Sequence, residues 1–482
     1  MPLILHPHEI SGGDRLKVGG KAFALARLVK AGFEVPEFLS ITADAYRRFV
    51  ETTGLAERIL LELNRKELRQ MRWEEIWDCA TRIRNLFLRA PMPAGLAEEL
   101  EEAVSHRFGE RPLAVRSSAP DEDAAASSFA GLHESYLNLR GAAAVLDHTR
   151  KVWASLWSDA ALLYRQELGL DVARSAMAVA VQAMALGERS GIVFSQDPAQ
   201  PSQAVVEAVH GLNQGLVDGA VEPDRWVVDR DFGRVLSHAP AKRERRAAAG
   251  AAGIEWVGIP AEMAGRPPLA PVEVLAVYDL ARKAERYFGR PQDVEWTISD
   301  GRLLLLQSRP VTTRQQADAG DQRAWYLSLH RSFDNLKRLH RKVEEELIPA
   351  MVREADALAA VEVSALTDTG LVDEIKRRWE INDNWVKVYW ADFIPFAHGI
   401  RLFGQIYNDA LRPADPYEFV DLLTRTDMAS LARNRMLAEL AAEVRRDPAV
   451  ADCLGSGECG ERAPEFRSRL KDFIAAFGDL SC

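Results

Sequence analysis

The chain has 482 residues, a formal net charge of -10 at pH 7, and 47% hydrophobic residues. This length predicts more than one domain, each with enough apolar side chains for a real core. The acidic balance argues against a nucleic-acid partner, because proteins that bind nucleic acids usually present a basic face.

The sequence contains no apolar run long enough to cross a membrane, and the N-terminal MPLILHPHEI lacks a charged leader followed by a long apolar core. We therefore expect a cytoplasmic protein with no membrane partner. Four cysteines are too few and too clustered for a disulfide framework: Cys79, Cys453, Cys459 and Cys482. Free thiols are favoured over a zinc site, which would need further ligands at zinc spacing.

The first informative motif is a pair of glycines at the start of a helical pattern. Gly19 and Gly20 precede Lys21, and apolar residues then recur at helical spacing as far as Leu28. Lys21 would lie in the first turn, where backbone N–H groups already favour an anion, so a phosphate is a suitable partner. The alternative is a solvated lysine on an amphipathic helix, since a lone GGK motif often occurs by chance.

A second motif follows a Pro-punctuated strand at 32–42 and helical patterning over 43–108. A short apolar strand from Leu113 delivers Arg116 to a loop of Ser, Ala and Gly residues that ends at Gly131. Such a loop is small enough for its backbone to close over phosphates. Its acidic stretch, 121–123, would repel phosphate, so we expect those side chains to face solvent or a partner domain.

Residues 230–271 are charged and rich in Ala, Gly and Pro, which predicts an exposed insertion. Its basic run, 242–246, is more typical of a solvated loop than of a nucleic-acid patch.

A β-hairpin is predicted next, at 291–312, where two β-rich runs flank a three-residue loop at 299–301 that ends in glycine. With that loop, period-two alternation places six side chains on one face: Glu295, Thr297, Leu303, Leu305, Gln307 and Arg309. A carboxylate beside an amide oxygen suits Mg²⁺, and a guanidinium suits a phosphate oxygen. The alternative is an ordinary amphipathic hairpin whose polar face meets water.

The remainder of the chain is predicted to be helical after a polar linker. Helical patterns cover 325–347, 371–390, 400–411 and 427–446. The run 385–399 is dense in aromatic residues. Such density indicates either a packed core, which is the commoner case, or the wall of an apolar ligand pocket.

Six stretches occur in order along the chain: GGKAFALARL, GFEVPEFLSIT, VRSSAPDEDAAASSFAG, VQAMALGERSGIVFSQDP, GLVDGAVEPDRWVV and VEWTISDGRLLLLQSRPVT. Their order and spacing resemble the nucleotide-binding domain of the pyruvate phosphate dikinase and phosphoenolpyruvate synthase family. The resemblance implies an α+β fold, with an ATP-grasp nucleotide-binding domain over 1–315 and a linker over 316–325. A mainly α-helical domain, expected to be incomplete, would occupy 326–482, and it resembles the middle part of rifampin-phosphotransferase-like chains.

The resemblance also implies ATP and Mg²⁺ as cofactors and assigns roles to five residues. Lys21 and Arg116 match the phosphate-binding Lys and Arg of the family, and Arg309 matches the Arg of its QxRP motif, which also contacts phosphate. Glu295 and Gln307 match its magnesium ligands.

Further nucleotide contacts follow from the same resemblance. Gln182 and Met184 lie where the family has its adenine-side hinge, Glu207 precedes the glycine turn, and Gly131 belongs to the loop expected over the phosphates. One departure is Gln214, where relatives often carry Glu; the replacement removes a charge and leaves the nucleotide affinity open.

In this family the phosphoryl group passes from ATP to a histidine on a separate domain, and then to an acceptor such as pyruvate. None of the ten histidines of this chain lies in the Gly-rich and Ser/Thr-rich context expected of that carrier. We therefore expect the donor part of an ATP-dependent phosphotransferase, with the carrier histidine on a missing segment or a partner chain. Two alternatives remain: a rifampin-like antibiotic phosphotransferase, and a non-catalytic nucleotide-binding regulatory module.

Overall fold

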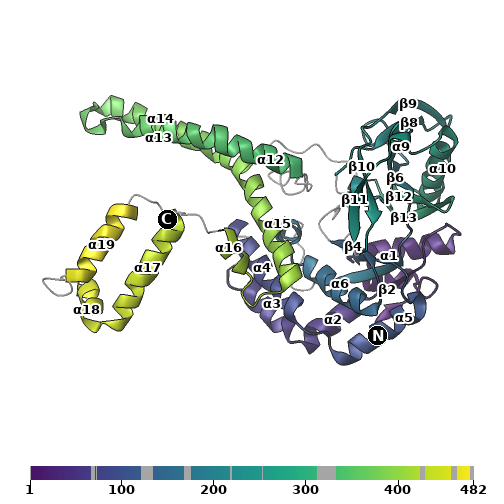
Figure 1. Cartoon of the computed structure of the whole chain (residues 1–482), viewed down its shortest axis with the longest axis horizontal. Coiled ribbons are helices and arrows are strands. Elements are labelled where there is room, and N and C mark those ends of the chain that lie inside the picture. The colour runs from purple at the N-terminus through teal and green to yellow at the C-terminus, as the bar shows by residue number, and fades with distance from the viewer. Residues whose placement is uncertain are drawn as a thin grey trace. The chain divides into compact units, whose positions relative to one another are not determined.

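A computed structural model describes residues 2–66, 71, 73–120, 134–167, 175–217, 220–251, 253–311, 333–423, 429–456 and 464–477 (Figure 1). The chain divides into two compact units, Met1–Gln405 and Ile406–Cys482. The mixture of helices and sheets confirms the predicted α+β class. The predicted linker 316–325 lies outside the described residues, so the predicted domain boundaries stay predictions.

The first sheet has five antiparallel strands in the order β1-β2-β5-β3-β4. Its strands are β1 (Ile4–Leu5), β2 (Phe38–Ile41), β3 (Leu113–Ser118), β4 (Ser135–Leu139) and β5 (Ala178–Ala183). The helices of this part are α2 (Ala43–Thr52), α3 (Leu55–Leu63), α4 (Trp73–Arg89), α5 (Ala94–Phe108), α6 (Ala142–Ser155) and α7 (Asp159–Glu167). β5 is buried on both faces, as expected for a central strand between two cores.

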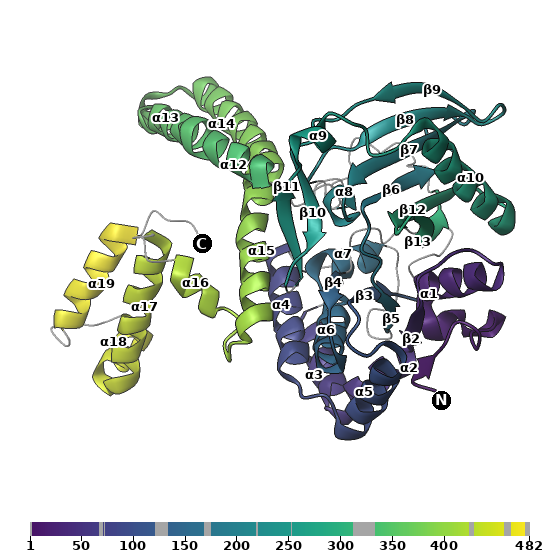
Figure 2. The same cartoon turned by 45° about the vertical axis from the view of Figure 1, so that its right-hand side comes forward.

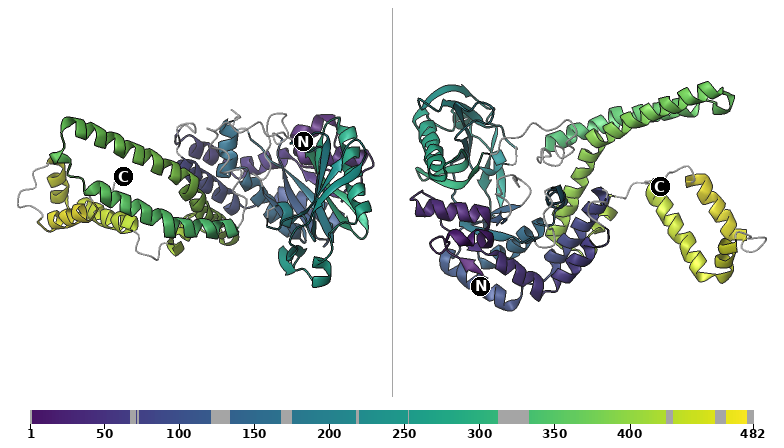
Figure 3. Two further views of the ribbon diagram at one scale, coloured as in Figure 1. Left: turned by 90° about the horizontal axis from the view of Figure 1, so that it is seen from above. Right: turned by 180° about the vertical axis from the view of Figure 1, so that it is seen from behind.

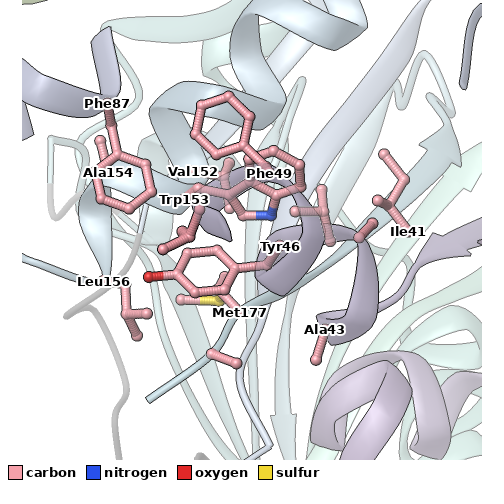
Figure 4. Packing of buried hydrophobic residues seen from close by; sticks show 14 of the residues in the cluster. Ile41, Ala43, Tyr46, Phe49, Phe87, Val152, Trp153, Ala154, Leu156 and Met177 are labelled. Atoms are coloured by element: carbon pink, nitrogen blue, oxygen red, sulfur yellow. The ribbon is translucent and has the colours of Figure 1, made fainter. Parts of the chain in front are cut away.

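An aromatic cluster fills the core between the first sheet and its helices (Figure 4). The rings of Phe49 and Trp153 lie 5.0 Å apart, and those of Tyr46 and Phe87 lie 5.8 Å apart. The indole N–H of Trp157 donates to the Tyr46 hydroxyl at 3.0 Å, which satisfies both buried polar groups. Burial raises the pKa of that hydroxyl, so Tyr46 stays neutral and serves the core.

The second sheet has six antiparallel strands in the order β13-β12-β6-β7-β8-β9. These are β6 (Arg189–Phe194), β7 (Gln203–His210), β8 (Asp224–Asp229), β9 (Arg234–Ala239), β12 (Gln292–Ser299) and β13 (Arg302–Pro310). Helix α10 (Pro271–Phe288) covers one face, where Val294 and Trp296 are buried. The short η1 (Gly12–Asp14) leads into α1 (Arg15–Lys30), which packs against strands of both sheets, β5 and β13 among them.

The hairpin β12–β13 has a two-residue loop, so the prediction of a three-residue loop was wrong. Asp300 and Gly301 take positive φ values of 50° and 70°, the conformation that an Asp-Gly turn favours. A bulge at Leu306 then shifts the register, so that Glu295 pairs with Gln307 while Trp296 pairs with Leu305.

The bulge decides which side chains share a face. Glu295, Gln307 and Arg309 do share one, as predicted. Leu303 and Leu305 lie on the opposite, core-facing side with Trp296, against the prediction, because the extra residue reverses the alternation on β13.

The predicted exposed insertion at 230–271 is mostly exposed, as expected, but it is also largely ordered secondary structure, which composition did not predict. It forms β9, a separate two-stranded sheet of β10 (Arg245–Ala249) and β11 (Ile254–Gly258), and the short helix α9 (Ala261–Ala264). Within the basic run, Arg243 pairs with the carboxylate of Asp224, which is 1% exposed. The run is therefore not simply a solvated loop.

The described residues 333–405 are helical. Their elements are α12 (Phe333–Arg341), the π-helix η4 (Lys342–Leu347), α13 (Ile348–Ala359), η5 (Val363–Ala365), α14 (Asp368–Val388), the π-helix η6 (Tyr389–Phe393) and α15 (Ile394–Leu411). α13 and α14 run side by side in opposite directions (Figure 3), and the Trp385 indole donates to Glu354 between them. None of the described side chains in the aromatic run 385–399 is buried, so the prediction of a packed core there was wrong.

The second unit contains α16 (Glu418–Leu423), α17 (Ala429–Arg446), α18 (Pro448–Ser456) and α19 (Pro464–Phe477). Leu440, Val450 and Phe466 form a small buried cluster within it. Across the described residues of the chain, no helix is both long and apolar enough to span a membrane.

Candidate functional site

The two sheets meet at Arg116, which β3 contributes from the first sheet. Its guanidinium donates to a carboxylate oxygen of Glu295 at 3.1 Å and to the Leu306 carbonyl at 3.2 Å. Both partners belong to the second sheet, and the carbonyl is the one at the bulge. The Arg116 and Glu295 side chains are 15% and 14% exposed, so this ion pair is partly shielded from water.

A cross-strand row on the second sheet groups the predicted metal ligands with a further carboxylate. Gln307 pairs with Glu295, Glu295 with Ile192, and Ile192 with Glu207. Directly paired residues share a face, so Glu207 lies on the same face as Glu295, about 10 Å away across two strand spacings. This is the face opposite Val294 and the α10 core.

Arg309 is held by a residue that the sequence reasoning missed. Its Nε and Nη2 atoms lie 2.8 and 2.7 Å from one carboxylate oxygen of Asp293, the cross-strand partner of Arg309. Asp293 is 5% exposed. Its position two residues before Glu295 was the available signal, because period two places both carboxylates on one face.

Three carboxylates on one face are electrostatically costly. Burial raises the pKa of Glu207, and the negative charge of Asp293 adds to the rise, whereas Arg225 opposes it. Burial likewise raises the pKa of Asp293, against the effect of Arg309, and Glu295 adds to the rise. A divalent cation on this face would relieve that repulsion.

Lys21 lies in the first turn of the helical segment that begins after a break in α1 at Gly19, as the glycine pair predicted. Gly19 has φ 75°, and a Cβ atom there would lie 1.9 Å from the Ser118 carbonyl oxygen, so only glycine fits. Around this close approach, the Ser118 hydroxyl donates to the Val18 carbonyl at 2.7 Å and accepts from the Ala22 N–H at 3.1 Å. The α1 break is therefore fixed to the end of β3.

The same attachment brings Lys21 to the site. The Lys21 ammonium reaches the Ser117 hydroxyl at 3.3 Å, one residue beyond Arg116. The two serines of VRSSA were the signal for these contacts. We call the set Lys21, Arg116, Glu295, Gln307 and Arg309 the inter-sheet site.

Gln182 and Met184 lie where the chain leaves the first sheet for the second. Gln182 is 2% exposed near the end of β5, and its amide nitrogen has no hydrogen-bond partner among the described residues. The Met184 N–H donates to the Pro112 carbonyl at 2.9 Å, just before the chain enters β6. The buried, unsatisfied amide is compatible with a ligand contact. Gly131 lies outside the described residues.

These features define a nucleotide-binding class of protein: two antiparallel sheets that bring a lysine and arginines to a row of carboxylates. Residues 15–326 match the family model described as the pyruvate phosphate dikinase AMP/ATP-binding domain. The chain therefore belongs to this family, whose nucleotide-binding domain is ATP-grasp-like, and the predicted resemblance is confirmed.

The curated proteins that this chain is similar to include phosphoenolpyruvate synthases and rifampicin phosphotransferases. The chain is 32% identical over 443 residues to a phosphoenolpyruvate synthase of Aeropyrum pernix, covering 82% of this chain and 51% of that protein. It is 37% identical over 315 residues to a rifampicin phosphotransferase of Streptomyces sviceus, covering 64% of this chain and 36% of the relative. The chain is 32% identical over 356 residues to the phosphoenolpyruvate synthase of Pyrococcus furiosus, covering 64% of this chain and 43% of that protein. The chain thus spans about half or less of the length of these relatives.

Proposed function

We propose that this chain is the ATP-binding donor part of a phosphoenolpyruvate-synthase-like phosphotransferase. It would pass a phosphoryl group from Mg-ATP to a carrier histidine outside these residues, and from there to pyruvate or another small acceptor. The observation that supports this most directly is the 3.1 Å contact between Arg116 and Glu295, which joins a phosphate-binding candidate to a metal-binding candidate across two sheets.

The cationic residues would supply charge neutralisation and positioning, the main demands of phosphoryl transfer. Lys21 offers a compact charge beside Ser117, and Arg116 offers a fork of donors. Arg309 is oriented by Asp293, which fixes its guanidinium plane. In the structure the Arg116 guanidinium donates to Glu295 and to the Leu306 carbonyl. Nucleotide phosphates would compete with those two acceptors for its N–H groups.

The oxygen-bearing residues fit a magnesium ion. Glu295 and Gln307 are cross-strand partners, and an acid with an amide oxygen is a donor set that Mg²⁺ accepts when water and phosphate complete its shell. Glu295 and Gln307 would hold Mg²⁺ together with the nucleotide phosphates, and the bound ion would screen the phosphate charges.

The base and ribose of ATP would lie toward Gln182, Met184 and Glu207. The unsatisfied amide nitrogen of Gln182 provides a donor, and the segment at Met184 links the two sheets. Gly131 would close over the phosphates from the small-residue loop.

A second candidate is an antibiotic phosphotransferase with the same donor chemistry and a bulky apolar acceptor. The rifampicin phosphotransferase relative and the partly exposed aromatic side chains of 385–399, such as Tyr389 at 43% exposure, favour it. Product analysis with pyruvate and with rifampicin separates the two functions. A regulatory module would bind ATP without phosphorylating any carrier.

The direct test supplies the chain with Mg²⁺, ATP labelled at the β or γ position, and a separately purified carrier-histidine domain from a relative. We expect acid-labile, base-stable label on the added domain and none on this chain alone. Robust labelling of this chain alone, lost when one of its own histidines such as His133 is replaced, would contradict the donor-part proposal.

A further inference from the structure

The hairpin β10–β11 is paired with neither end of the two large sheets. Its strands form five rungs of their own, from Arg245 opposite Gly258 to Ala249 opposite Ile254. Figure 2 shows it standing beside both sheets, with its tip at β4. A two-stranded hairpin is at best marginally stable in water by itself, so its position must be held by contacts on its neighbours.

The middle of the hairpin is fixed to the second sheet. The Leu212 N–H donates to the Ala247 carbonyl at 2.9 Å, and Gly211 forms a bridge with Ala247. A Cβ atom at Gly211 would lie 2.3 Å from that carbonyl oxygen, so the approach requires glycine. Trp256 adds a packing contact, because a Cβ atom at Gly215 in α8 (Gln214–Val217) would meet its ring at 3.2 Å.

A side chain of β4 holds the tip of the hairpin against the first sheet. The Asn138 Nδ2 atom, on β4, donates to the carbonyl oxygens of Gly250 and Gly253, both at 2.8 Å. Two carbonyl acceptors require the amide nitrogen at this place, since an amide oxygen would be repelled by both. Asn138 is 3% exposed and takes φ 58°, a left-handed conformation that Asn tolerates better than most residues.

The hairpin therefore ties β4 to the turn after β7 without using any residue of the inter-sheet site. The Arg116 contacts with Glu295 and Leu306 also join the sheets, but bound phosphates and metal would compete for them. The Asn138 contacts lie outside the inter-sheet site, so bound phosphates and metal would not compete for them.

We propose that β10–β11 is a clasp that holds the two sheets together around the inter-sheet site, with Asn138 as its release point. Opening the sheets to exchange nucleotide requires these two buried hydrogen bonds to break. The link to nucleotide exchange rests on the proposed function, whereas the mechanical role of the clasp rests on the contacts alone.

Two variants at one position test the clasp. Asn138→Gly removes the amide and keeps the left-handed backbone free of strain. Asn138→Asp keeps the shape and turns a carboxylate toward two carbonyl oxygens. Gly258→Ala is the matched control, because a Cβ atom at the base of the hairpin would meet no atom within 4 Å.

The first measurement is the distance between the sheets. Spin labels at Ser105→Cys on α5 and Ser237→Cys on β9, both exposed positions, report it by pulsed electron resonance. In this background Cys453, Cys459 and Cys482 are replaced by Ser, and the buried Cys79 is kept. We expect longer and broader distances in both Asn138 variants and no change in Gly258→Ala.

The second measurement is the release rate of a fluorescent N-methylanthraniloyl ATP with Mg²⁺. Losing two buried hydrogen bonds should speed release about tenfold. Unchanged distances in folded Asn138→Gly overturn the clasp, even if Asn138→Asp fails to fold. Changed distances in a chain that binds no nucleotide support the clasp and refute the proposed function instead.

Discussion

The two sheets contribute opposite chemistry to the inter-sheet site. The first sheet supplies Arg116 and, through Ser117, a position for Lys21, so its contribution is cationic. The second sheet supplies the carboxylates Glu207, Asp293 and Glu295 together with the Gln307 amide. Under the proposed function, a magnesium nucleotide would need both sets, because its phosphates would need the cations and its metal would need the oxygens. The site is therefore a property of the contact between the sheets.

The largest effect should come from removing the metal-binding candidate of the second sheet. Glu295→Ala should lower magnesium-dependent transfer to an added carrier domain by about 1000-fold, since an electrostatic contact at the reacting phosphates is lost. The melting temperature should fall only slightly, because the variant loses the ion pair with Arg116 but also removes one of three carboxylates from the same face. Glu34→Ala, which removes an exposed carboxylate paired with Arg302, is the control. Full ATP turnover by Glu295→Ala would remove Glu295 from the site.

The attachment of α1 to the first sheet can be broken at Gly19. Gly19→Ala forces a Cβ atom to 1.9 Å from the Ser118 carbonyl oxygen at φ 75°. We expect the free energy of unfolding to fall by about 2 to 4 kcal/mol, measured by urea titration. Gly12→Ala, where a Cβ atom meets nothing within 4 Å, should change it by less than about 0.5 kcal/mol. Equal stability of the two variants would show that the close approach relaxes.

The cationic contribution can be altered while its charge is kept. Arg116→Lys should lower transfer about tenfold, because an ammonium cannot reproduce the fork that reaches both Glu295 and Leu306. The rate of phosphoryl transfer to the added carrier domain is measured by steady-state kinetics. Arg302→Lys, at an exposed ion pair, is the matched control. Identical kinetics in wild type and Arg116→Lys would make Arg116 a structural residue.

The smallest effect should appear in the pH dependence of stability. Burial raises the folded-state pKa of Glu207, so ionised Glu207 destabilises the folded chain once pH exceeds its unfolded pKa of about 4.3. The cost grows until pH passes the raised folded pKa and then stays constant. Glu207→Gln should therefore melt higher than wild type at pH 7, with the difference shrinking toward pH 4. A pH-independent difference would mean that charge is not its cause.

Sequence reasoning recovered much of the second sheet's contribution, although partly for a wrong reason. A two-residue loop without a bulge would have placed Glu295 and Gln307 on opposite faces. The bulge at Leu306 compensates, so the predicted grouping of Glu295, Gln307 and Arg309 is confirmed although the predicted loop was wrong. No local signal marks Leu306 as a bulge, because its hydrogen-bond pattern depends on the partner strand.

The features outside the site that composition did not predict have a common cause. Composition predicted that 230–271 is exposed, but it did not predict that Arg243 pairs with the buried carboxylate of Asp224 or that Asn138 donates to carbonyls at the hairpin tip. Aromatic density predicted a core at 385–399, yet the described side chains there are not buried. A side chain is buried only when another part of the chain packs over it, and composition does not say which parts pack together.

By itself, the sequence determined the features that depend on near neighbours along the chain. Strand alternation puts Asp293 on the face of Glu295, although our prediction did not include Asp293; helical spacing predicted α14, and the ordered motifs indicated the family. Only the tertiary structure decided that Arg116 of β3 meets Glu295 of β12, 179 residues apart, and that Asn138 closes the hairpin tip. The physical reason is range: turn and strand preferences act over a few residues, whereas a contact between sheets forms only when both cores have packed.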